Sequence, residues 1–184
     1  MIVIALHGPM GSGKTTACDW IKQRLTEKGL TNTLVPIAKP LKDFARQLGW
    51  DGAKDAKGRR LLQLLGTECG RKCIGDDIWV LKWKQAIEEE DCKVILCDDM
   101  RFLNEYSSIK MMNVYHKVIM IKLTGRGYEV TGWWCKLVKW LRLRFGLVHP
   151  SEIPLPDYLF DHVICNDREI FNLRLKLDKI LETI

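Results

Sequence analysis

The chain has 184 residues, of which 47% are hydrophobic and 28% are charged, a balance that is ordinary for a globular domain. This length fits one domain with room for a small mobile insert. The N-terminal apolar run stops at residue 6 without a basic leader, and no other run is long enough to cross a bilayer, so we expect a protein that is neither secreted nor membrane-spanning. The net charge of +6 suits an anionic partner, either nucleotide phosphates or nucleic acid.

Short apolar runs alternate with amphipathic stretches along the chain, a pattern typical of a parallel sheet covered by helices. The predicted strands are 2–7, 33–38, 93–98, 117–123 and 162–165, and the predicted helices are 14–28, 40–48, 58–72, 77–90, 101–113 and 168–183. The runs 94–97 and 118–121 lack polar alternation, as expected for strands buried on both faces. The stretches 39–91 and 124–160 break the alternation, and we interpret them as inserts on the sheet rather than as separate domains.

A phosphate-binding loop follows the first predicted strand, since the segment Gly8-Pro9-Met10-Gly11-Ser12-Gly13-Lys14-Thr15 matches GxxxxGK[ST] in full. Glycines let backbone N–H groups turn inward toward phosphate oxygens, and the positive end of the next helix points to the same place. Lys14 is expected to reach the β- and γ-phosphates of ATP, and the Thr15 hydroxyl to ligate Mg²⁺. The predicted ATP-binding residues of this loop are Gly8, Gly11, Ser12, Gly13, Lys14, Thr15 and Thr16.

Two carboxylates, Asp98 and Asp99, follow the third predicted strand. Ligands in open α/β sheets bind beyond the carboxyl ends of the strands, so an acid here could hold Mg²⁺ directly or through water. One of the two could instead only cap the helix that begins near Arg101. We assign Thr15 and Asp98 to the metal, although the sequence leaves open which of the two acids serves it.

The phosphate loop identifies the donor and not the acceptor. The chain has no Asn-Lys-x-Asp signature of a GTPase, and 184 residues leave no room for the transmission domain of a motor protein. A small-molecule kinase is the natural interpretation. A nucleoside monophosphate is mostly dianionic at neutral pH, so as an acceptor it needs no general base but does need cations that offset the repulsion between two polyanions.

Three arginines are candidates for this role, because the planar guanidinium group binds phosphate through two parallel hydrogen bonds. Arg71 follows Gly66-Thr67-Glu68-Cys69-Gly70, Arg101 follows the two carboxylates, and Arg126 stands between Gly125 and Gly127. An ordinary surface position is the alternative for each of them.

Five segments behind the phosphate loop resemble, in order, the deoxynucleoside monophosphate kinases of bacteriophages, which are relatives of the adenylate kinase superfamily. The segments are Lys39-Pro40-Leu41-Lys42-Asp43-Phe44-Ala45, Leu65-Gly66-Thr67-Glu68-Cys69-Gly70-Arg71, Asp77-Ile78-Trp79-Val80, Asp99-Met100-Arg101-Phe102-Leu103-Asn104-Glu105 and Phe160-Asp161-His162-Val163-Ile164-Cys165-Asn166-Asp167. The Gly-Thr-Glu-x-Gly-Arg and Asp-x-Arg-Phe-x-Asn-Glu elements are more specific than a phosphate loop alone. The similarity spans most of the chain and fails mainly over 127–148.

The resemblance implies a core domain, a helical insert that binds the acceptor monophosphate, and a lid. It also implies that Arg71 holds the acceptor phosphate beside Trp79 as a base-stacking surface, and that Asp99 and Arg101 line the reaction centre. Asn166 and Asp167 match the loop that lies beside the donor base. The acceptors of the family are several deoxynucleoside monophosphates, which implies modest discrimination between bases.

We therefore predict one P-loop kinase domain over 1–184, with a three-layer α/β P-loop NTPase fold, a parallel five-stranded sheet, a helical monophosphate-binding insert over about 39–91 and a lid over about 125–150. The predicted activity is transfer of the γ-phosphate of ATP to a (deoxy)nucleoside monophosphate, with ATP and Mg²⁺ as cofactors. The predicted catalytic residues are Lys14, Arg71, Asp99, Arg101 and Arg126, and the predicted acceptor site also contains Lys39 and Trp79. From position alone, Lys39 and Lys42 could equally be solvated lysines at the start of a helix.

Weaker patterns leave alternatives open. Trp79 and Trp83 share a helix face, where core packing competes with stacking on a base. The basic, tryptophan-rich segment 133–145 is interpreted as a lid helix that packs on the core or on a second subunit of a homodimer, with a membrane or nucleic-acid surface as the alternative. His7 is expected to be structural, and His149 either structural or close to phosphate.

The seven cysteines include no CxxC pair, and the pair Cys69 and Cys73 has no second pair to complete a zinc site. We expect reduced thiols and a cytoplasmic protein, in the host cytoplasm if the chain comes from a phage. The predicted partner is a small-molecule nucleotide, with no nucleic acid and no membrane. The competing hypotheses are another small-molecule kinase, such as one acting on dephospho-coenzyme A, and a nucleic-acid-binding ATPase.

Overall fold

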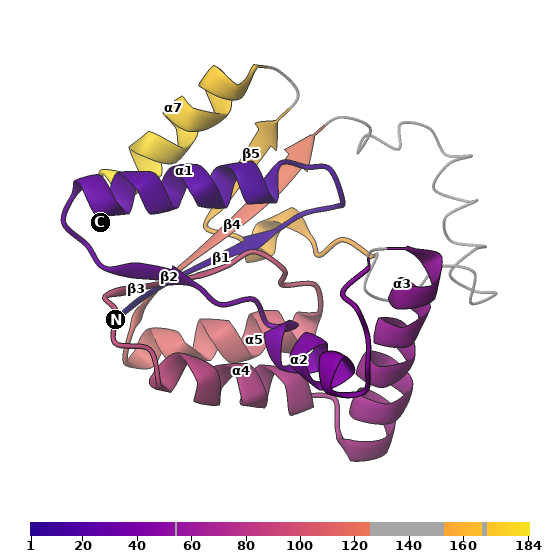
Figure 1. Cartoon of the computed structure of the whole chain (residues 1–184). Coiled ribbons are helices and arrows are strands. Elements are labelled where there is room, and N and C mark those ends of the chain that lie inside the picture. The colour runs from indigo at the N-terminus through magenta and orange to yellow at the C-terminus, as the bar shows by residue number, and fades with distance from the viewer. Residues whose placement is uncertain (54, 126–152, 167–168) are drawn as a thin grey trace.

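The computed structural model describes residues 1–53, 55–125, 153–166 and 169–184, and within them five parallel strands form one sheet (Figure 1). The strands are β1 (Ile2–His7), β2 (Asn32–Leu34), β3 (Val94–Cys97), β4 (Lys117–Gly125) and β5 (His162–Asn166). Their order in the sheet is β2-β3-β1-β4-β5, and every neighbouring pair is parallel. The predicted α/β class and five-stranded parallel sheet are confirmed.

Helices cover both faces of the sheet (Figure 1). The helices are α1 (Lys14–Glu27), α2 (Lys39–Gln47), α3 (Ala56–Gln63), η1 (Leu64–Ile74), α4 (Ile78–Glu88), α5 (Leu103–Met111), η2 (Met112–Val114), η4 (Asp157–Leu159) and α7 (Ile170–Leu181). Successive residues of a strand point to opposite faces, so Ile4 and Leu6 of β1 pack with α1 and α7. Val3 and Ala5 pack with α4 and α5 on the other face. The result is the predicted three-layer arrangement.

The second strand is shorter than predicted, since β2 ends at Leu34 rather than at residue 38. The Val35 N–H still donates to Leu96 O at 2.9 Å, but the Val35 carbonyl turns away from the sheet and accepts the Trp83 Nε1–H at 2.7 Å. Backbone groups beyond this point find side-chain partners, which ends the ladder although the residues remain apolar.

The predicted helix 58–72 is wrong as a single regular helix. Here α3 continues into η1, an 11-residue π-helix in which a backbone N–H bonds the carbonyl five residues earlier. The bond from Gly75 N–H to Gly70 O, at 3.1 Å, has this spacing. π-helical turns are rare and are frequent at functional sites, so this element directs attention to the insert.

Several predictions lie outside the described residues. These are the lid beyond Gly125, with Arg126, the segment 133–145 and His149, and also Asp167. All six cysteines in the described part of the chain are free thiols. Among the described helices, none combines the length and the hydropathy that crossing a bilayer requires.

Trp83 offers a test of the core on the α4 side. Its side chain is fully buried, and its indole N–H satisfies the Val35 carbonyl where β2 leaves the sheet. Trp83→Phe removes this hydrogen bond and part of the ring volume, so we expect the free energy of unfolding in urea to fall by about 2–3 kcal/mol. Leu81→Ala, on an exposed part of the same helix, is the control and should change it by less than about 0.5 kcal/mol. Equal effects of the two substitutions would contradict the packing described here.

Candidate active site

The phosphate loop, 8–15, connects β1 to α1 at the carboxyl edge of the sheet. Gly11 and Gly13 have φ angles of 79° and 92°, in the left-handed region that residues with a Cβ rarely adopt. Gly13 caps the N-terminus of α1, so the positive end of that helix faces the loop. The backbone therefore has the strongly curved conformation that the motif predicts.

Residues of the strands β4 and β5 lie in close contact with this loop. A Cβ on Gly8 would collide with the Leu123 carbonyl of β4, and a Cβ on Gly13 would collide with the Asn166 side chain of β5. The Asn166 amide also donates a hydrogen bond of 3.0 Å to the Ser12 carbonyl. Asn166, predicted from the resemblance to lie near the donor base, thus contacts the phosphate loop directly.

Two side chains of the loop fit an anionic ligand. Lys14 Nζ donates to the carbonyls of Gly8 and Pro9, each at 2.7 Å, so the ammonium group lies against the backbone of the loop. Burial, followed by the charge of Arg101, lowers the pKa of Lys14. Ser12 is 3% exposed, and its Oγ has no hydrogen-bond partner among the described residues, which is unusual for a buried hydroxyl. A phosphate oxygen would satisfy both groups, while Thr15 and Thr16 stand exposed in the first turn of α1.

The two aspartates beyond β3 have different surroundings. Asp99 accepts the backbone N–H groups of Ile37 at 2.7 Å and Ala38 at 3.1 Å, and so anchors the connection between β2 and α2. Burial, and then the charge of Asp99, raises the pKa of Asp98, while Lys42 and Lys14 oppose this shift. The charge of Lys14 in the phosphate loop therefore acts on Asp98.

An open cavity of about 230 Å³ lies between the insert and the carboxyl end of β3. This volume is several times the ~30 Å³ that one water occupies, so the cavity can hold an organic ligand. Its apolar walls include Ile37, Leu41, Leu62, Trp79 and Phe102, and its polar lining consists of Lys42, Gln63, Thr67, Arg71, Asp99, Arg101 and Glu105. A mixed lining of this kind, which includes three cationic side chains, is typical of a site for a charged organic molecule.

Arg71 is held in this cavity by several partners. One guanidinium nitrogen bonds Glu105 Oε1 at 2.5 Å and the other bonds the Asp76 carbonyl at 2.7 Å. The guanidinium lies over the Phe102 ring, 4.0 Å from its centroid, which adds a cation–π contact. The side chain is 10% exposed, so Arg71 is a fixed cation rather than a free surface arginine.

Glu105 organises both arginines of the cavity. Its Oε1 pairs with Arg71, and its Oε2 accepts the backbone N–H groups of Arg101 at 2.7 Å and Phe102 at 3.1 Å, in a capping interaction at the start of α5. Burial raises the pKa of Glu105, while these N–H groups and Arg71 favour the carboxylate. The guanidinium of Arg101 lines the cavity and has no hydrogen bond or ion pair to the described residues.

The glycines of Gly-Thr-Glu-x-Gly-Arg allow other side chains to approach η1. A Cβ on Gly66 would lie 2.9 Å from Leu41, and one on Gly70 would lie 2.7 Å from the Trp79 indole. Trp79 Nε1–H donates to the Gly66 carbonyl at 2.8 Å, which fixes the ring as a wall of the cavity.

The structure thus brings Arg71, Trp79, Asp99 and Arg101 together around one cavity. Lys39 instead forms a surface ion pair with Asp43 at 2.9 Å and does not belong to the described lining, whereas Lys42 does. The prediction omitted Glu105 and Gln63 as site residues. Glu105 stands inside the Asp-x-Arg-Phe-x-Asn-Glu element, so a search for an acid that could pair with a buried arginine would have found it. Gln63 carries no comparable signal in the sequence.

Comparison with known proteins agrees with this geometry. No protein-family model matches the chain. It is similar to the deoxynucleoside-5'-monophosphate kinase of Escherichia phage T5, with 38% identity over 121 residues, 65% of this chain. The match covers 43% of the length of that relative. The resemblance to phage deoxynucleoside monophosphate kinases is therefore confirmed as a similarity over about two thirds of the chain.

Solved structures of P-loop kinases share the fold. The APS kinase of Mycobacterium tuberculosis, in complex with AMPPNP and APS, aligns with a TM-score of 0.51 and 13% identity, over 98% of this chain and 95% of that one. The shikimate kinase of Bacteroides thetaiotaomicron aligns with a TM-score of 0.51 and 12% identity, over 99% and 97% of the two chains. The fold of this chain is therefore the one that these P-loop kinases share.

Gly70 tests the packing of the cavity wall. Gly70→Ala would drive a methyl group into the hydrogen-bonded Trp79 ring, so we expect a loss of about 1–2 kcal/mol in unfolding free energy after the gain in helix propensity. Near-ultraviolet circular dichroism should show a change in the tryptophan signal. Cys69→Ala, one residue earlier and exposed, is the matched control and should leave both measurements unchanged. A stabilised Gly70→Ala protein would show that the ring does not pack on η1.

Proposed function

We propose that this protein transfers the γ-phosphoryl group of ATP to the phosphate of a deoxynucleoside monophosphate and so forms a diphosphate. The observation that carries this proposal is the placement of the cationic cavity beside the phosphate loop. Arg101 lines the cavity, and its neighbour Met100 is bonded at 2.9 Å to His7, the residue that precedes the phosphate loop. The charge of Arg101 also lowers the pKa of Lys14, so the two sites are adjacent. The phage T5 relative, a deoxynucleoside-5'-monophosphate kinase by name, supports the choice of acceptor.

The donor would bind at the loop. The Lys14 ammonium would leave the Gly8 and Pro9 carbonyls and donate hydrogen bonds to the ATP phosphates. The Ser12 hydroxyl, which has no hydrogen-bond partner among the described residues, would bond to the phosphates as well. Thr15 and Asp98 would hold Mg²⁺, which supplies neutralisation of phosphate charge. Asp98 is favoured over Asp99, because both oxygens of Asp99 already accept backbone N–H groups.

The acceptor would lie in the cavity with its phosphate toward Arg71 and Arg101. An acceptor phosphate oxygen then attacks the γ-phosphorus in line, a new P–O bond forms, and the bond to the β–γ bridging oxygen breaks with ADP as the leaving group. The acceptor phosphate is ionised at neutral pH, so no side chain has to remove a proton. The cations of the site lower the repulsion between the two reactants and fix their orientation.

The walls of the cavity suit a nucleoside. Trp79, Phe102 and Leu41 offer apolar surface to a base, and Gln63 offers an amide that can donate or accept hydrogen bonds. An amide of this kind can bond to more than one base, which agrees with the modest discrimination expected of this family. A nucleotide substrate accounts for the net charge of +6 without a nucleic-acid partner. A homodimer, a host-cytoplasmic location and the lid over 125–150 remain predictions.

An acceptor panel tests the proposed activity. With ATP and Mg²⁺, we expect ADP formation that depends on dTMP, dGMP, dCMP or dAMP, and little with dephospho-coenzyme A or with single-stranded DNA. Lys14→Ala should lower kcat by at least about 100-fold, because it removes the cation that bridges the phosphates. Lys22→Ala, on the same helix beyond the loop, is the matched control and should keep full activity. DNA-stimulated hydrolysis without transfer would favour the ATPase hypothesis instead.

Arg71 separates the acceptor site from the donor site. Arg71→Ala should raise the acceptor KM by about 10- to 100-fold, the loss expected for a charged hydrogen bond to phosphate, and should change the ATP KM by less than about threefold. Arg71→Lys keeps a cation beside Glu105 but loses the planar guanidinium that can form two parallel hydrogen bonds with a phosphate. We therefore expect an intermediate acceptor KM and a stable fold. Arg46→Ala removes an exposed arginine of α2 and serves as the control. An unchanged acceptor KM in Arg71→Ala would exclude this residue from the site.

A further inference from the structure

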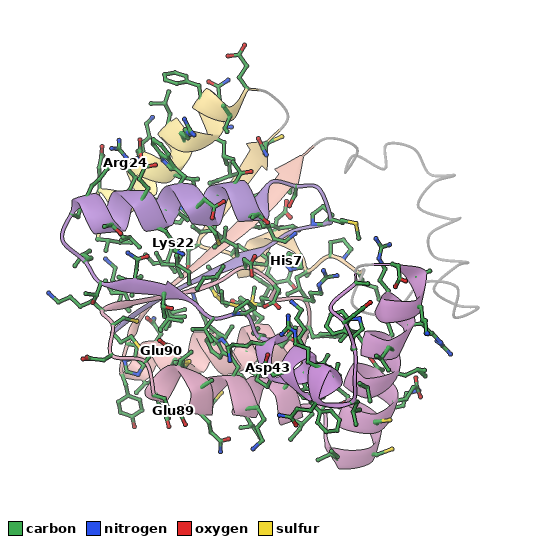
Figure 2. The ribbon with its side chains drawn as sticks, in the orientation of Figure 1. His7, Lys22, Arg24, Asp43, Glu89 and Glu90 are labelled. Atoms are coloured by element: carbon green, nitrogen blue, oxygen red, sulfur yellow. The ribbon has the colours of Figure 1, made fainter. Side chains whose placement is uncertain are left out.

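His7 is a buried histidine that the proposed reaction does not use. It is the last residue of β1 and directly precedes Gly8 of the phosphate loop. The side chain is 4% exposed and lies in the interior of the molecule, between the two helical layers (Figure 2). Its ring stacks on Phe160 with centroids 5.2 Å apart, so the imidazole is fixed in one orientation.

Both ring nitrogens of His7 bond to backbone groups from other parts of the chain. Nδ1 lies 2.9 Å from the carbonyl of Met100, and Nε2 lies 3.2 Å from the N–H of Leu155. A backbone N–H can only donate and a carbonyl can only accept, so Nδ1 must carry the proton and Nε2 must be bare. This is one specific neutral tautomer.

The charges around His7 favour the neutral ring. The pKa of His7 is lowered to about 4, first by burial and then by the positive charges of Lys122, Lys14 and Arg101, while the bond to Met100 acts in the opposite direction. A second proton on the ring would place the Nε2–H opposite the Leu155 N–H, so that two donors would face each other without an acceptor. The ring therefore keeps its acceptor for Leu155 throughout the neutral pH range.

Lys122 completes the contact with Leu155. It is the register partner of His7 on β4 and is 2% exposed. Its ammonium donates to the Leu155 carbonyl and to Asp157 Oδ1, each at 2.5 Å. The N–H and the C=O of Leu155 are thus both bound by side chains of adjacent strands, and we call His7, Lys122 and Leu155 the Leu155 clamp.

We infer that His7 and Lys122 are positioning residues for phosphoryl transfer, which hold Leu155 and the Arg101 connection in register with the phosphate loop. This inference rests on the proposed function. His7 adjoins Gly8, Met100 adjoins Arg101, and Leu155 belongs to the segment that leads into β5. One imidazole therefore joins three parts of the chain at the carboxyl edge of the sheet. Neither His7 nor Lys122 belongs to the described lining of the acceptor cavity, so both act through the groups that they hold.

The tautomer of His7 is the first test, and it does not depend on activity. A long-range ¹H–¹⁵N spectrum of the wild-type protein should show Nδ1 protonated and Nε2 bare from about pH 5 to 8, since the pKa is about 4. Assignment uses the His7→Asn protein, in which this signal set is missing. An Nε2–H tautomer, or titration of His7 near pH 6.5, would overturn the clamp.

Kinetics of matched variants are the second test. His7→Asn can still donate to the Met100 carbonyl but is too short to accept from Leu155, whereas His7→Gln can accept from Leu155 but loses the bond to Met100. We expect each to lower kcat by about tenfold and to change the ATP KM by less than about threefold. Lys122→Met should lower kcat similarly, and His7→Asn with Lys122→Met should be no slower than about the slower single variant, because both act on Leu155. Wild-type kcat in both His7 variants, or losses that multiply in the double variant, would overturn the inference.

Tyr106→Phe is the control for a merely structural effect. The Tyr106 hydroxyl donates to the Leu159 carbonyl at 2.7 Å, so this change removes one hydrogen bond to the same segment outside the clamp. It should lower the melting temperature as His7→Asn does and leave kcat unchanged. If the Lys122→Met protein does not fold, the kcat values of the two His7 variants and the tautomer of His7 in the wild-type protein test the inference. A wild-type protein that phosphorylates no monophosphate would refute the proposed function, while the tautomer would still test the clamp.

Discussion

The close approach of the phosphate-loop backbone to the ends of β4 and β5 is the constraint on which the site depends. β1 lies between β3 and β4, so the loop that leaves it passes directly over its neighbours. At Gly8 and Gly13 there is no space for a Cβ, because the Leu123 carbonyl and the Asn166 side chain already fill it. Glycine is needed here for closeness as well as for curvature. The same contacts direct the N-terminus of α1 toward the place where β3 ends, and so bring the anion site to the acidic pair.

The charges of the site are arranged so that its cations remain available to phosphate. Two carboxylates that could neutralise them are partly occupied by backbone N–H groups: Asp99 by the β2–α2 connection, and Glu105 by the start of α5. Glu105 still pairs with Arg71, but it binds one side of the guanidinium and leaves Arg101 unpaired among the described residues. A buried cation without any partner would be costly, and a fully paired one would bind phosphate weakly. Arg71, which has Glu105 as its one carboxylate partner, lies between an unpaired and a fully paired cation.

The sequence predicted the elements whose causes are local. The apolar runs of β1, β3 and β4, the loop motif and helix α1 were all recognised within a few residues of their observed bounds, since each depends on its own residues. The end of β2 depends instead on Trp83, which is 48 residues away and captures the Val35 carbonyl. The two glycines of the π-helix face Leu41 and Trp79, which come from other helices and leave no space for a Cβ. The pattern of apolar residues within 58–72 gives no information on these contacts, because the partners lie elsewhere in the chain.

The same distinction explains the site. Arg71 was identified from its motif, but its partner Glu105 is 34 residues away, and only the fold shows that they meet. Lys39 and Lys42 could not be separated by position. The structure separates them, because Leu41 and Ala45 bury one side of α2, and this orientation leaves Lys42 at the cavity and pairs Lys39 with Asp43 at the surface. Contacts across long sequence separations are therefore what the sequence could not supply.

The two faces of the sheet contribute differently to the site. The helix that follows the phosphate loop packs with α7 on one face, in a core cluster separate from that of α4 and α5 on the other. The proposed acceptor cavity is lined by residues of α2, α3, η1, α4, α5 and the β3–α5 connection, and these helices lie on the second side of the sheet. The proposed donor loop thus leads into a helix of one cluster, the proposed acceptor cavity is lined by helices on the other side, and the two approach each other at the carboxyl edge of the sheet. Since packing contacts couple neighbours far more strongly than distant residues, changes in the insert can alter the acceptor site while the donor loop keeps its shape.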